Sequence, residues 1–345
     1  YGEHRLLKRG TAVTAFVHHA SLRHAWHPVA ESVDVGADQP RAVTLLGDRL
    51  VVWRAPSGEL EAAPDRCPHR EAPLSLGWVH DGVLTCAYHG WGFGDGGRCV
   101  RVPSSGDGAT VPPTAHLPNI HVRDRYGLVW LCLDEPHHDI PEIRHEDDQA
   151  FRRINSGVQV WHTAATRMTD NFMDISHFPW VHTGTFGDRQ RVSVPKLELG
   201  DLGQGWFGYE FEVDANNPSD ESQLISGSAA DVVHRHMTTG FTLPLTVRST
   251  IRYEDGLEHI LLLCSTPIDD ESSYFTFVVW RNDDRTTDPE EIIAFDRAIG
   301  AEDQRMLERL SGTLPLGRTD LANVQADRCS VEWRRRFAEL VLGAD

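Results

Sequence analysis

The sequence is short of cysteine, of positive charge and of long apolar runs, and each shortage excludes a class of protein. Six cysteines among 345 residues are too few for a disulfide scaffold, which favours metal chemistry in a reducing compartment. The 33 Lys and Arg residues against 51 Asp and Glu residues give a formal net charge of −18, which repels phosphate backbones and anionic lipids. The longest apolar runs, at Leu128–Leu133 and Ile260–Cys264, are too short to span a bilayer, and nothing near Tyr1 has the pattern of a secretory signal. We therefore expect a cytoplasmic protein without nucleic-acid or membrane partners.

The length and the texture of the chain predict two domains, because 345 residues exceed one usual domain length. Between His24 and Leu133, short strand-like segments alternate with clusters of Gly, Pro, Asp and Ser, which is typical of a small β domain with long loops. Residues 134–148 are charged and contain two prolines, so they are the best linker candidate. The expected fold class is α+β, an all-β domain followed by an antiparallel sheet with helices. The expected boundaries are an unassigned N-terminal extension at 1–20 and domains at 21–135 and 136–345.

The second half is expected to alternate between strands and helices. The strands are expected at 192–199, 207–213, 247–253, 259–265 and 274–280, and the helices at 170–177, from Asp288 onward, around 306–310 and at 331–342. The glycine-rich string at 203–208 matches a dinucleotide fingerprint, but residues 209–213 alternate like a strand where that fingerprint needs a helix. We therefore expect no bound NAD or flavin on this chain, so its electrons must come from a separate protein.

The first group of candidate metal ligands consists of two tight pairs, Cys67 with His69 and Cys86 with His89. Cysteine and histidine both bind metal cations once they lose or lack a proton. A zinc site is one interpretation, and the ligand types alone permit it. The other is a binuclear iron–sulfur cluster, which the mixing of one Cys and one His in each pair favours.

The second group lies between Asn171 and His182 and contains two histidines. Asp174 and His177 are three residues apart, so a helix over 170–177 would put them on one face. His177 and His182 are five apart, which is roughly 140° around an ideal helix, so we expect Pro179 to break the helix between them. Two histidines and one carboxylate form the facial triad of non-haem Fe(II) oxygenases. The carboxylate must come from elsewhere in the chain.

Both groups carry a resemblance to a known family. The stretches CPHREAPLSLG and CAYHGWGF, from Cys67 and Cys86 onward, resemble a Rieske [2Fe–2S] domain, without the extra loop cysteines of respiratory Rieske proteins. The pattern N-x-x-D-x-x-H-x₄-H, from Asn171 to His182, resembles the catalytic domain of Rieske non-haem iron oxygenases, the ring-hydroxylating oxygenase α-subunit family. The resemblance implies both cysteines on one iron of the cluster and the two loop histidines, His69 and His89, on the other.

The resemblance also implies a third iron ligand on a C-terminal segment and a role for Asp174. The family's third iron ligand is a distant Asp that matches Asp303, with Glu302 as the competing candidate and Asp296 as a weaker one. Asn171 and Asp174 are implied to be site residues. In the family's head-to-tail homotrimer, Asp174 would bridge a cluster histidine of one subunit to His177 of its neighbour. The alternative is a carboxylate that only orients His177.

The expected function is that of a terminal oxygenase, with O₂ as cosubstrate and electrons from a separate reductase, with or without a ferredoxin. The short chain resembles members that work with α-subunits alone, such as the vanillate and dicamba O-demethylases. The preferred reaction is therefore hydroxylation or oxidative demethylation of a small organic substrate, which is expected to be aromatic or cyclic. A cis-dihydroxylating dioxygenase is the alternative, and an electron carrier without oxygenase activity is an alternative of another class. The residues expected to line the substrate pocket are Thr166, Met168, Phe172, Phe241 and Trp280, with His234 or His236 as a further possibility.

Overall fold

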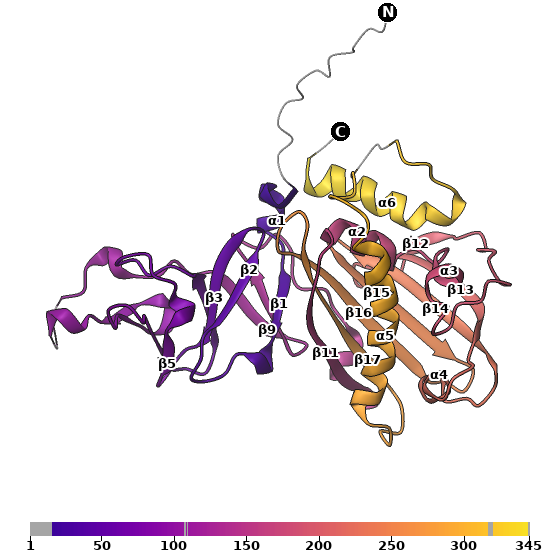
Figure 1. Ribbon diagram of the computed structural model, residues 1–345, viewed down its shortest axis with the longest axis horizontal. Helices are drawn as coiled ribbons and strands as arrows, with labels where there is room; N and C mark the ends of the chain where they lie inside the picture. The colour runs from indigo at the N-terminus through magenta and orange to yellow at the C-terminus, as the bar shows by residue number, and fades with distance from the viewer. Residues whose placement is uncertain (1–15, 107, 109, 317–319, 344–345) are drawn as a thin grey trace, which may run out of the picture.

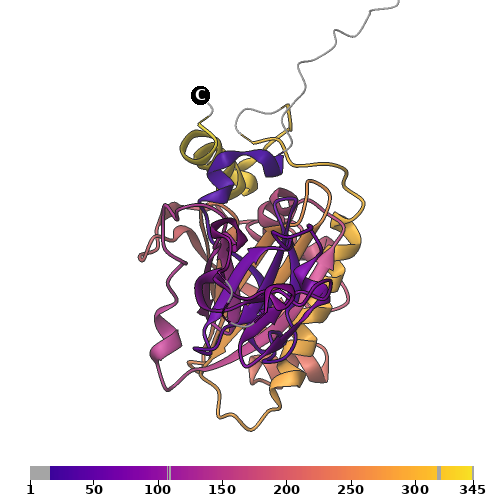
Figure 2. The ribbon, with the colours of Figure 1, turned by 90° about the vertical axis from the view of Figure 1, so that its left-hand side faces the viewer.

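The computed structural model describes residues 16–106, 108, 110–316 and 320–343. Of the predicted N-terminal extension, residues 1–15 lie outside the described part, and short helices follow at Phe16–His18 and α1 (Ala20–Arg23). Figure 1 shows two parts arranged along the long axis, small sheets in one and a single large sheet with helices in the other. Seen along that axis in Figure 2, the small sheets overlap the large one. The predicted α+β class, with an all-β part first, is confirmed.

The first part contains three small antiparallel sheets. They have the strand orders β1-β10-β9, β2-β3-β4 and β5-β6-β7-β8. Their bounds are β1 (His27–Glu31), β2 (Arg41–Leu45), β3 (Asp48–Arg54), β4 (Leu60–Pro64), β5 (Trp78–His80), β6 (Val83–Thr85), β7 (Gly92–Phe93), β8 (Cys99–Arg101), β9 (His121–Arg125) and β10 (Leu128–Cys132). One buried apolar cluster includes Trp53, Leu84 and Phe93 together with Cys67 and Cys86. The two cysteine loops are therefore anchored on the core of this part.

The second part is built on a seven-stranded antiparallel sheet of order β11-β17-β16-β15-β14-β13-β12. The strands are β11 (Arg152–Trp161), β12 (Leu199–Asp201), β13 (Phe207–Asn216), β14 (Val232–Thr242), β15 (Thr246–Tyr253), β16 (Glu258–Pro267) and β17 (Ser273–Arg281). The helices are α2 (Ala165–Phe172), α3 (Phe178–Val181), α4 (Asp220–Ser226), α5 (Pro289–Leu307) and α6 (Arg328–Arg336), and a π-helical turn follows at Phe337–Val341. Figure 1 shows α5 lying along this sheet.

Side-chain alternation gives the large sheet two buried faces. On β17, Phe275 and Phe277 pack with Ile292 of α5, whereas Val278 and Trp280 pack with Trp130 of the first part. The sheet is therefore covered by helices on one face and by the first part on the other. A cavity between α5 and the sheet is lined by the odd-numbered residues of β14, β15, β16 and β17.

The C-terminal helix prediction is confirmed at its start and wrong in its length. Asp288 caps α5, because its side chain accepts a hydrogen bond from the backbone N–H of Glu290, and Pro289 is the first helical residue. The helix continues to Leu307, so the helical stretch expected around 306–310 is the last turn of α5. Phe207 begins the strand that was expected after the glycine-rich string, which agrees with the rejection of a dinucleotide fingerprint there.

One predicted strand is wrong, and two strands were not predicted from the sequence. Residues 192–198 pair with no strand in the described part of the chain; Leu197 is buried and its carbonyl accepts a hydrogen bond from Arg328 instead. Strand β11 was not predicted because its register shifts between Asn155 and Val158, which interrupts the alternation. Strand β14 was not predicted because Arg235 and other polar residues hide its apolar pattern. No helix in the described part of the chain is long and apolar enough to cross a membrane.

Candidate metal centres and the adjoining cavity

The two cysteine loops of the first part have the same backbone hydrogen-bond pattern. The N–H groups of Cys67 and Cys86 each donate to the carbonyl five residues later, and the residues four positions after each cysteine donate back to its carbonyl. Those fourth residues are Glu71 and Gly90, with φ of 60° and 69°. A left-handed residue at the same place closes both loops, although only Gly90 adopts it without strain.

This shared geometry directs the cysteines inward and the histidines outward. Cys67 and Cys86 are both buried and unpaired, His69 is half-buried and His89 is exposed. The rings of His69 and His89 lie 4.5 Å apart between centroids, and His69 stacks on Trp91 at 4.6 Å. Burial, together with the neighbouring Cys86, raises the pKa of the Cys67 thiol to about 11. Two inner thiols and two outer imidazoles fit a [2Fe–2S] cluster held with one iron inside and the other facing the surface.

The second group is folded differently from the expectation. Helix α2 ends at Phe172, and the backbone turns at Asp174, whose Oδ1 accepts hydrogen bonds from the N–H and the hydroxyl of Ser176. His177 and His182 flank the four-residue helix α3 as its N-cap and C-cap. The expected helix over 170–177, ended by Pro179, is therefore wrong. Pro179 lies in the first turn of α3. Backbone N–H groups in a first turn have no acceptor within the helix, so proline loses no hydrogen bond there.

His177, His182 and Asp303 converge on one point. Their facing atoms form a triangle: the two Nε2 atoms are 3.1 Å apart, and Asp303 Oδ1 lies 3.4 Å from His177 Nε2 and 3.5 Å from His182 Nε2. Ligands about 2.1 Å from one ion and at right angles to each other are about 3 Å apart, close to this triangle. Asp303 Oδ1 is buried and accepts no hydrogen bond from any residue that the structure describes. A cation would satisfy this oxygen, so the three residues fit a mononuclear metal.

The other nitrogen of each histidine is held by a separate carboxylate. Asp174 Oδ2 lies 3.1 Å from His177 Nδ1, and Glu302 Oε2 lies 3.2 Å from His182 Nδ1. Glu302 is itself fixed by the N–H of Gly184 at 2.9 Å and the hydroxyl of Thr185 at 2.8 Å. These contacts orient both imidazoles with Nε2 toward the common point.

The charges around His177 also alter its protonation. Burial lowers the pKa of His177, but the negative charges of Asp174 and Asp303 beside it outweigh burial and raise it to about 9. Burial raises the pKa of Asp174, but the contacts with His177 and Ser176 outweigh this and lower it. Asp174 therefore stays ionised, and a metal ion that binds His177 displaces a proton from it.

The competing acids of α5 have other partners. Glu302 is next to Asp303, about 100° around the helix, and reaches the far side of His182 instead. Asp296 lies two turns earlier and pairs with His259, with Asp296 Oδ2 3.1 Å from His259 Nε2. Of the three candidates, Asp303 is the one whose carboxylate faces both histidine Nε2 atoms.

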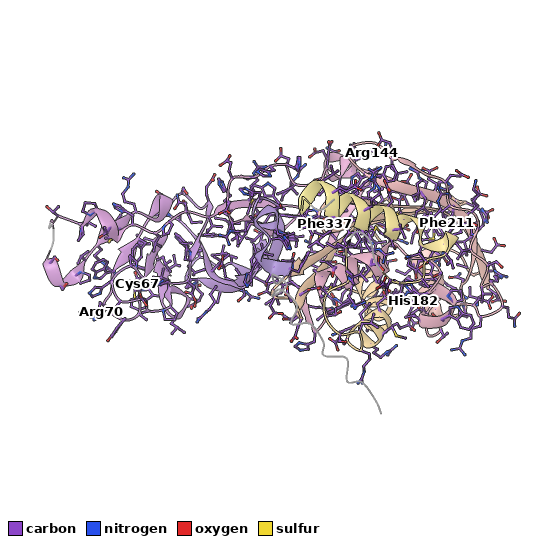
Figure 3. All side chains as sticks on the ribbon, turned by 90° about the horizontal axis from the view of Figure 1, so that it is seen from above. Cys67, Arg70, Arg144, His182, Phe211 and Phe337 are labelled. Carbon is purple, nitrogen blue, oxygen red and sulfur yellow. The ribbon has the colours of Figure 1, made fainter. Side chains whose placement is uncertain are left out.

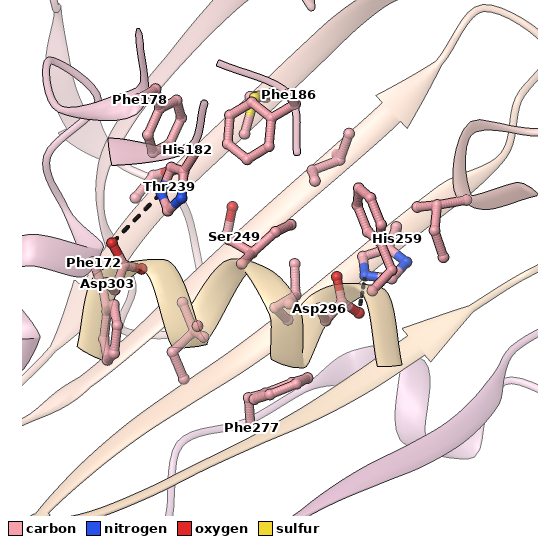
Figure 4. A pocket seen from close by; sticks show the side chains of 18 of the residues that line it. Phe172, Phe178, His182, Phe186, Thr239, Ser249, His259, Phe277, Asp296 and Asp303 are labelled. Atoms are coloured by element: carbon pink, nitrogen blue, oxygen red, sulfur yellow. Dashed lines mark ion pairs between the residues drawn. The ribbon is translucent and has the colours of Figure 1, made fainter. Parts of the chain in front are cut away.

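The triangle stands at one end of the cavity beneath α5, which has a volume of about 130 Å³. Figure 4 shows His182 and Asp303 at one end, His259 and Asp296 at the other, and Ser249 between them. Most of the lining is apolar, with Phe172, Phe275 and Phe277 among the aromatic residues. Asn171 also lines it, and its side-chain nitrogen is buried and has no hydrogen-bond partner among the described residues.

The other residues expected to line a pocket lie elsewhere. Trp280 is on the opposite face of β17, where its Nε1 donates to Glu146 at 2.7 Å. Met168 and Phe241 belong to buried apolar clusters, and the Thr166 hydroxyl accepts from the N–H of Leu314. None of these four lines the cavity beneath α5. His234 and His236 point away from the cavity toward acids at the surface. Arg235, between them, lines the cavity and was not predicted from the sequence.

The two candidate metal centres lie in different parts of the chain. Figure 3 shows Cys67 in the half that holds the small sheets and His182 in the half that holds the large sheet. Asp174, beside His177, keeps about a quarter of its side chain exposed, at 23%. Asp174 can therefore be contacted from outside the chain.

Comparisons with known proteins cover both parts. The "Rieske [2Fe-2S] domain" family matches residues 25–118, and the "Vanillate O-demethylase oxygenase C-terminal domain" family matches residues 161–343. Methylxanthine N3-demethylase NdmB of Pseudomonas putida is 31% identical over 338 residues, which are 94% of this chain and 90% of that protein. The structure of Pseudomonas putida NdmA with caffeine has a TM-score of 0.80 and 28% identity and covers 94% of this chain and 92% of its own. Dicamba monooxygenase bound to 3,6-dichlorosalicylic acid has a TM-score of 0.75 and 25% identity, covering 95% and 98%.

Proposed function

This chain belongs to the Rieske non-haem iron oxygenases, and from that premise we propose that it hydroxylates or oxidatively demethylates a small aromatic or cyclic substrate. The single observation that carries the proposal is the buried triangle of His177, His182 and Asp303 at the end of an apolar cavity. The relatives named above are N-demethylases and a monooxygenase, which favours the insertion of a single oxygen atom over cis-dihydroxylation. An electron carrier without catalysis would not need this site.

We propose Cys67, Cys86, His69 and His89 as the ligands of the [2Fe–2S] cluster, and His177, His182 and Asp303 as the ligands of the mononuclear iron. When bound, these groups supply single electrons and an O₂-binding centre with open coordination positions. The residues of the chain supply the arrangement. Asp174 and Glu302 fix the histidine rings, and Phe178 and Phe186 pack against His182. The substrate then lies in the cavity, with its reacting C–H bond toward the three ligands.

The overall reaction balances with an external reductant. One oxygen atom of O₂ enters a C–H bond of the substrate, and the other is reduced to water by two electrons and two protons, with the electrons coming from the external reductant. If the carbon belongs to a methyl group on oxygen or nitrogen, the hydroxymethyl product releases formaldehyde. Since the chain is an oxygenase component, the electrons come from a separate reductase, and we propose that this reductase acts directly or through a ferredoxin.

Metal analysis of anaerobically purified protein tests the proposal. We expect about three irons and two acid-labile sulfides per chain, with a red-brown Rieske spectrum. With a reductase from a related system, aryl methyl ethers or N-methylated heterocycles are expected to give O₂ consumption coupled to formaldehyde release. One zinc without sulfide would overturn the whole assignment. Two irons that do not rise to three after Fe(II) reconstitution would leave an electron carrier.

We propose Asp174 as the residue through which electrons reach the mononuclear site. In a homotrimer, His69 or His89 of the partner subunit would approach Asp174, which touches His177 on its inner side. Asp174→Ala is expected to keep both metal sites loaded and to slow single-turnover oxidation of the reduced cluster by about 10- to 100-fold. Stopped-flow spectroscopy of the reduced enzyme with O₂ and substrate measures this rate.

Asp170→Asn is the matched control for that prediction. Asp170 is a half-buried acid one turn earlier, 3.8 Å from Arg334, and it forms no ion pair with His177 in the described part of the chain. Burial raises its pKa to about 6, so an amide is a mild change there. The control is expected to oxidise its cluster at the original rate. An unchanged rate in Asp174→Ala would limit Asp174 to orienting His177.

Three further features are proposed on the same basis. We place the division between the two domains at residue 135, between the end of β10 and the start of β11. We expect the homotrimer to be the working assembly, which sedimentation of the holoenzyme checks. The cytoplasmic location predicted from six unpaired cysteines stays a prediction.

A further inference from the structure

Arg235 is a buried cation without a counter-ion in the wall of the cavity. It lies on β14, is 5% exposed and lines the cavity beneath α5. Its Nε is buried without a hydrogen-bond partner, and in the described part of the chain no carboxylate forms an ion pair with it. A buried charge without a partner is costly, so a protein retains one where something else completes the pairing.

The surroundings of Arg235 are aromatic. Its guanidinium carbon lies 5.6 Å from the ring centroid of Phe186 and 5.5 Å from that of Tyr253. Tyr253 is paired with Arg235 across β14 and β15, and its hydroxyl is buried without a hydrogen-bond partner in the described structure. Two unsatisfied donor groups therefore face the same space, and both suit an acceptor that carries negative charge.

The position of Arg235 relates it to the proposed iron site. Phe186 lies between Arg235 and His182, so the guanidinium carbon and the His182 ring are at most 10.5 Å apart, because the two separations are 5.6 and 4.9 Å. A molecule with one ring and a short substituent can contact Arg235 at one end and the proposed ligands at the other. The lining of the cavity is mostly apolar, with Met237, Ile251 and Leu261 on the sheet side.

From these contacts we propose that Arg235 binds a carboxylate on the substrate, which is therefore an apolar or aromatic acid. A guanidinium presents two parallel N–H donors that match a carboxylate, and the Tyr253 hydroxyl adds a third. The acid group fixes the ring in the cavity and directs the opposite end toward His177, His182 and Asp303. This inference rests on the proposed function for the reaction at that end, but binding at Arg235 is independent of it.

The acid in the same cavity does not supply the missing counter-ion. Asp296 pairs with His259 Nε2 at 3.1 Å, and His259 Nδ1 lies 3.2 Å from Arg281 Nη1. Arg281 in turn forms an ion pair with Asp283 at 2.9 Å. Asp296 is therefore held in a separate chain of contacts. If the cavity took an amine, Asp296 would bind it and Arg235 would oppose it.

Binding of matched neutral and charged probes tests this inference. The probes are 4-methoxybenzoate, 4-methoxybenzamide and 4-methoxybenzylamine, titrated into the holoenzyme under anaerobic conditions by calorimetry. The acid is expected to bind about 10- to 100-fold more tightly than the amide, the range of a charge-assisted hydrogen-bonded pair. Arg235→Met is expected to remove this preference while leaving the affinity for the amide within about twofold.

Two further variants guard the interpretation. Arg235→Lys keeps the charge but loses the two-pronged geometry, so it should retain part of the preference. Arg248→Met is the matched control, because Arg248 lies on the neighbouring strand with its Nε also unpartnered, but it faces Trp206 away from the cavity. Arg235→Met is expected to unfold at no lower temperature than the original protein, since it removes an unpaired buried charge.

The outcomes separate this inference from the proposed function. Equal binding of acid and amide, preference for the amine, no binding of the acid at millimolar concentration, or an unchanged preference in Arg235→Met would each overturn the role of Arg235. Tight binding of the acid without any turnover would support Arg235 and count against the oxygenase reaction. Turnover of neutral probes without any preference for acids would do the reverse.

Discussion

Asp303→Ala is expected to abolish oxygenase turnover, by at least about a hundredfold, while leaving the Rieske spectrum intact. The substitution removes one of three protein ligands proposed for the mononuclear iron, and loss of even an outer contact to a metal ligand typically costs 10- to 100-fold in affinity or activity. Iron should fall from about three to about two per chain. Because Asp303 Oδ1 accepts no hydrogen bond from the described residues, the fold should not depend on it.

The matched control is Asp296→Asn, on the same helix and the same stripe. Asp296 is seven residues earlier, which is about 10 Å along the axis, and its contact is with His259. This variant is expected to retain all its iron. Iron and sulfide analysis of each variant shows whether the mononuclear iron is lost, and the melting temperature shows whether the fold is destabilised. Full iron occupancy in Asp303→Ala, or iron loss in Asp296→Asn alone, would contradict the proposed ligand set.

Cys67→Ser is expected to lose the red-brown colour and both acid-labile sulfides, and with them all turnover supported by a reductase. Both loops close on their cysteines, and the clusters of this class need each thiolate. Iron should fall to about one per chain, held at the mononuclear site. The visible spectrum, sulfide analysis and turnover with a reductase report the three losses separately.

Cys99→Ser is the control for that variant. Cys99 lies buried in the same apolar cluster as Cys67, but its Sγ contacts the carbonyl of Arg101 at 3.7 Å and it lies outside both loops. Cys99→Ser replaces a sulfur by an oxygen in the same core as Cys67→Ser does, but at a residue outside the loops. The Cys99→Ser protein should therefore keep its iron–sulfur cluster. Loss of the cluster in both variants would point to damage of the core, and retention in both would overturn Cys67 as a ligand.

The metal-ligand candidates were predictable because short motifs carry them. In each loop a cysteine precedes a histidine by two or three positions, and His177 and His182 are only five positions apart. Within such spans the backbone allows few arrangements, so residue type and spacing nearly define the site. The local structure was less predictable: Pro179 was expected to end a helix and instead lies in the first turn of one.

The third ligand illustrates what helix periodicity leaves open. Asp296 and Asp303 are seven residues apart and share a stripe of α5, whereas Glu302 is adjacent to Asp303. All three are buried on the helix that covers the sheet. Which of them faces the histidines depends on how α5 lies against α3 and the sheet, and no local pattern specifies that.

Arg235 illustrates the same limit for a strand. The neighbours of Arg235 in the sequence, His234 and His236, were predicted as possible cavity residues, but they face acids at the surface. Because side chains alternate across a sheet, a shift of one residue exchanges the cavity face for the outer face. The sequence does not show the register of β14, since it does not show which strands flank it.

By itself, the sequence determined the chemistry of this protein: an acidic α+β chain with a Rieske-type ligand set, a histidine pair and a distant carboxylate. These features come from short motifs, from composition and from the resemblance to a family, so they can be predicted without knowledge of the fold. Only the tertiary structure shows that Asp303 Oδ1 faces both histidine Nε2 atoms, that Glu302 contacts His182, and that an unpaired guanidinium lies in the cavity of the described chain. Each of these depends on contacts between segments far apart in the chain, which the packing of α5 on the seven-stranded sheet brings together.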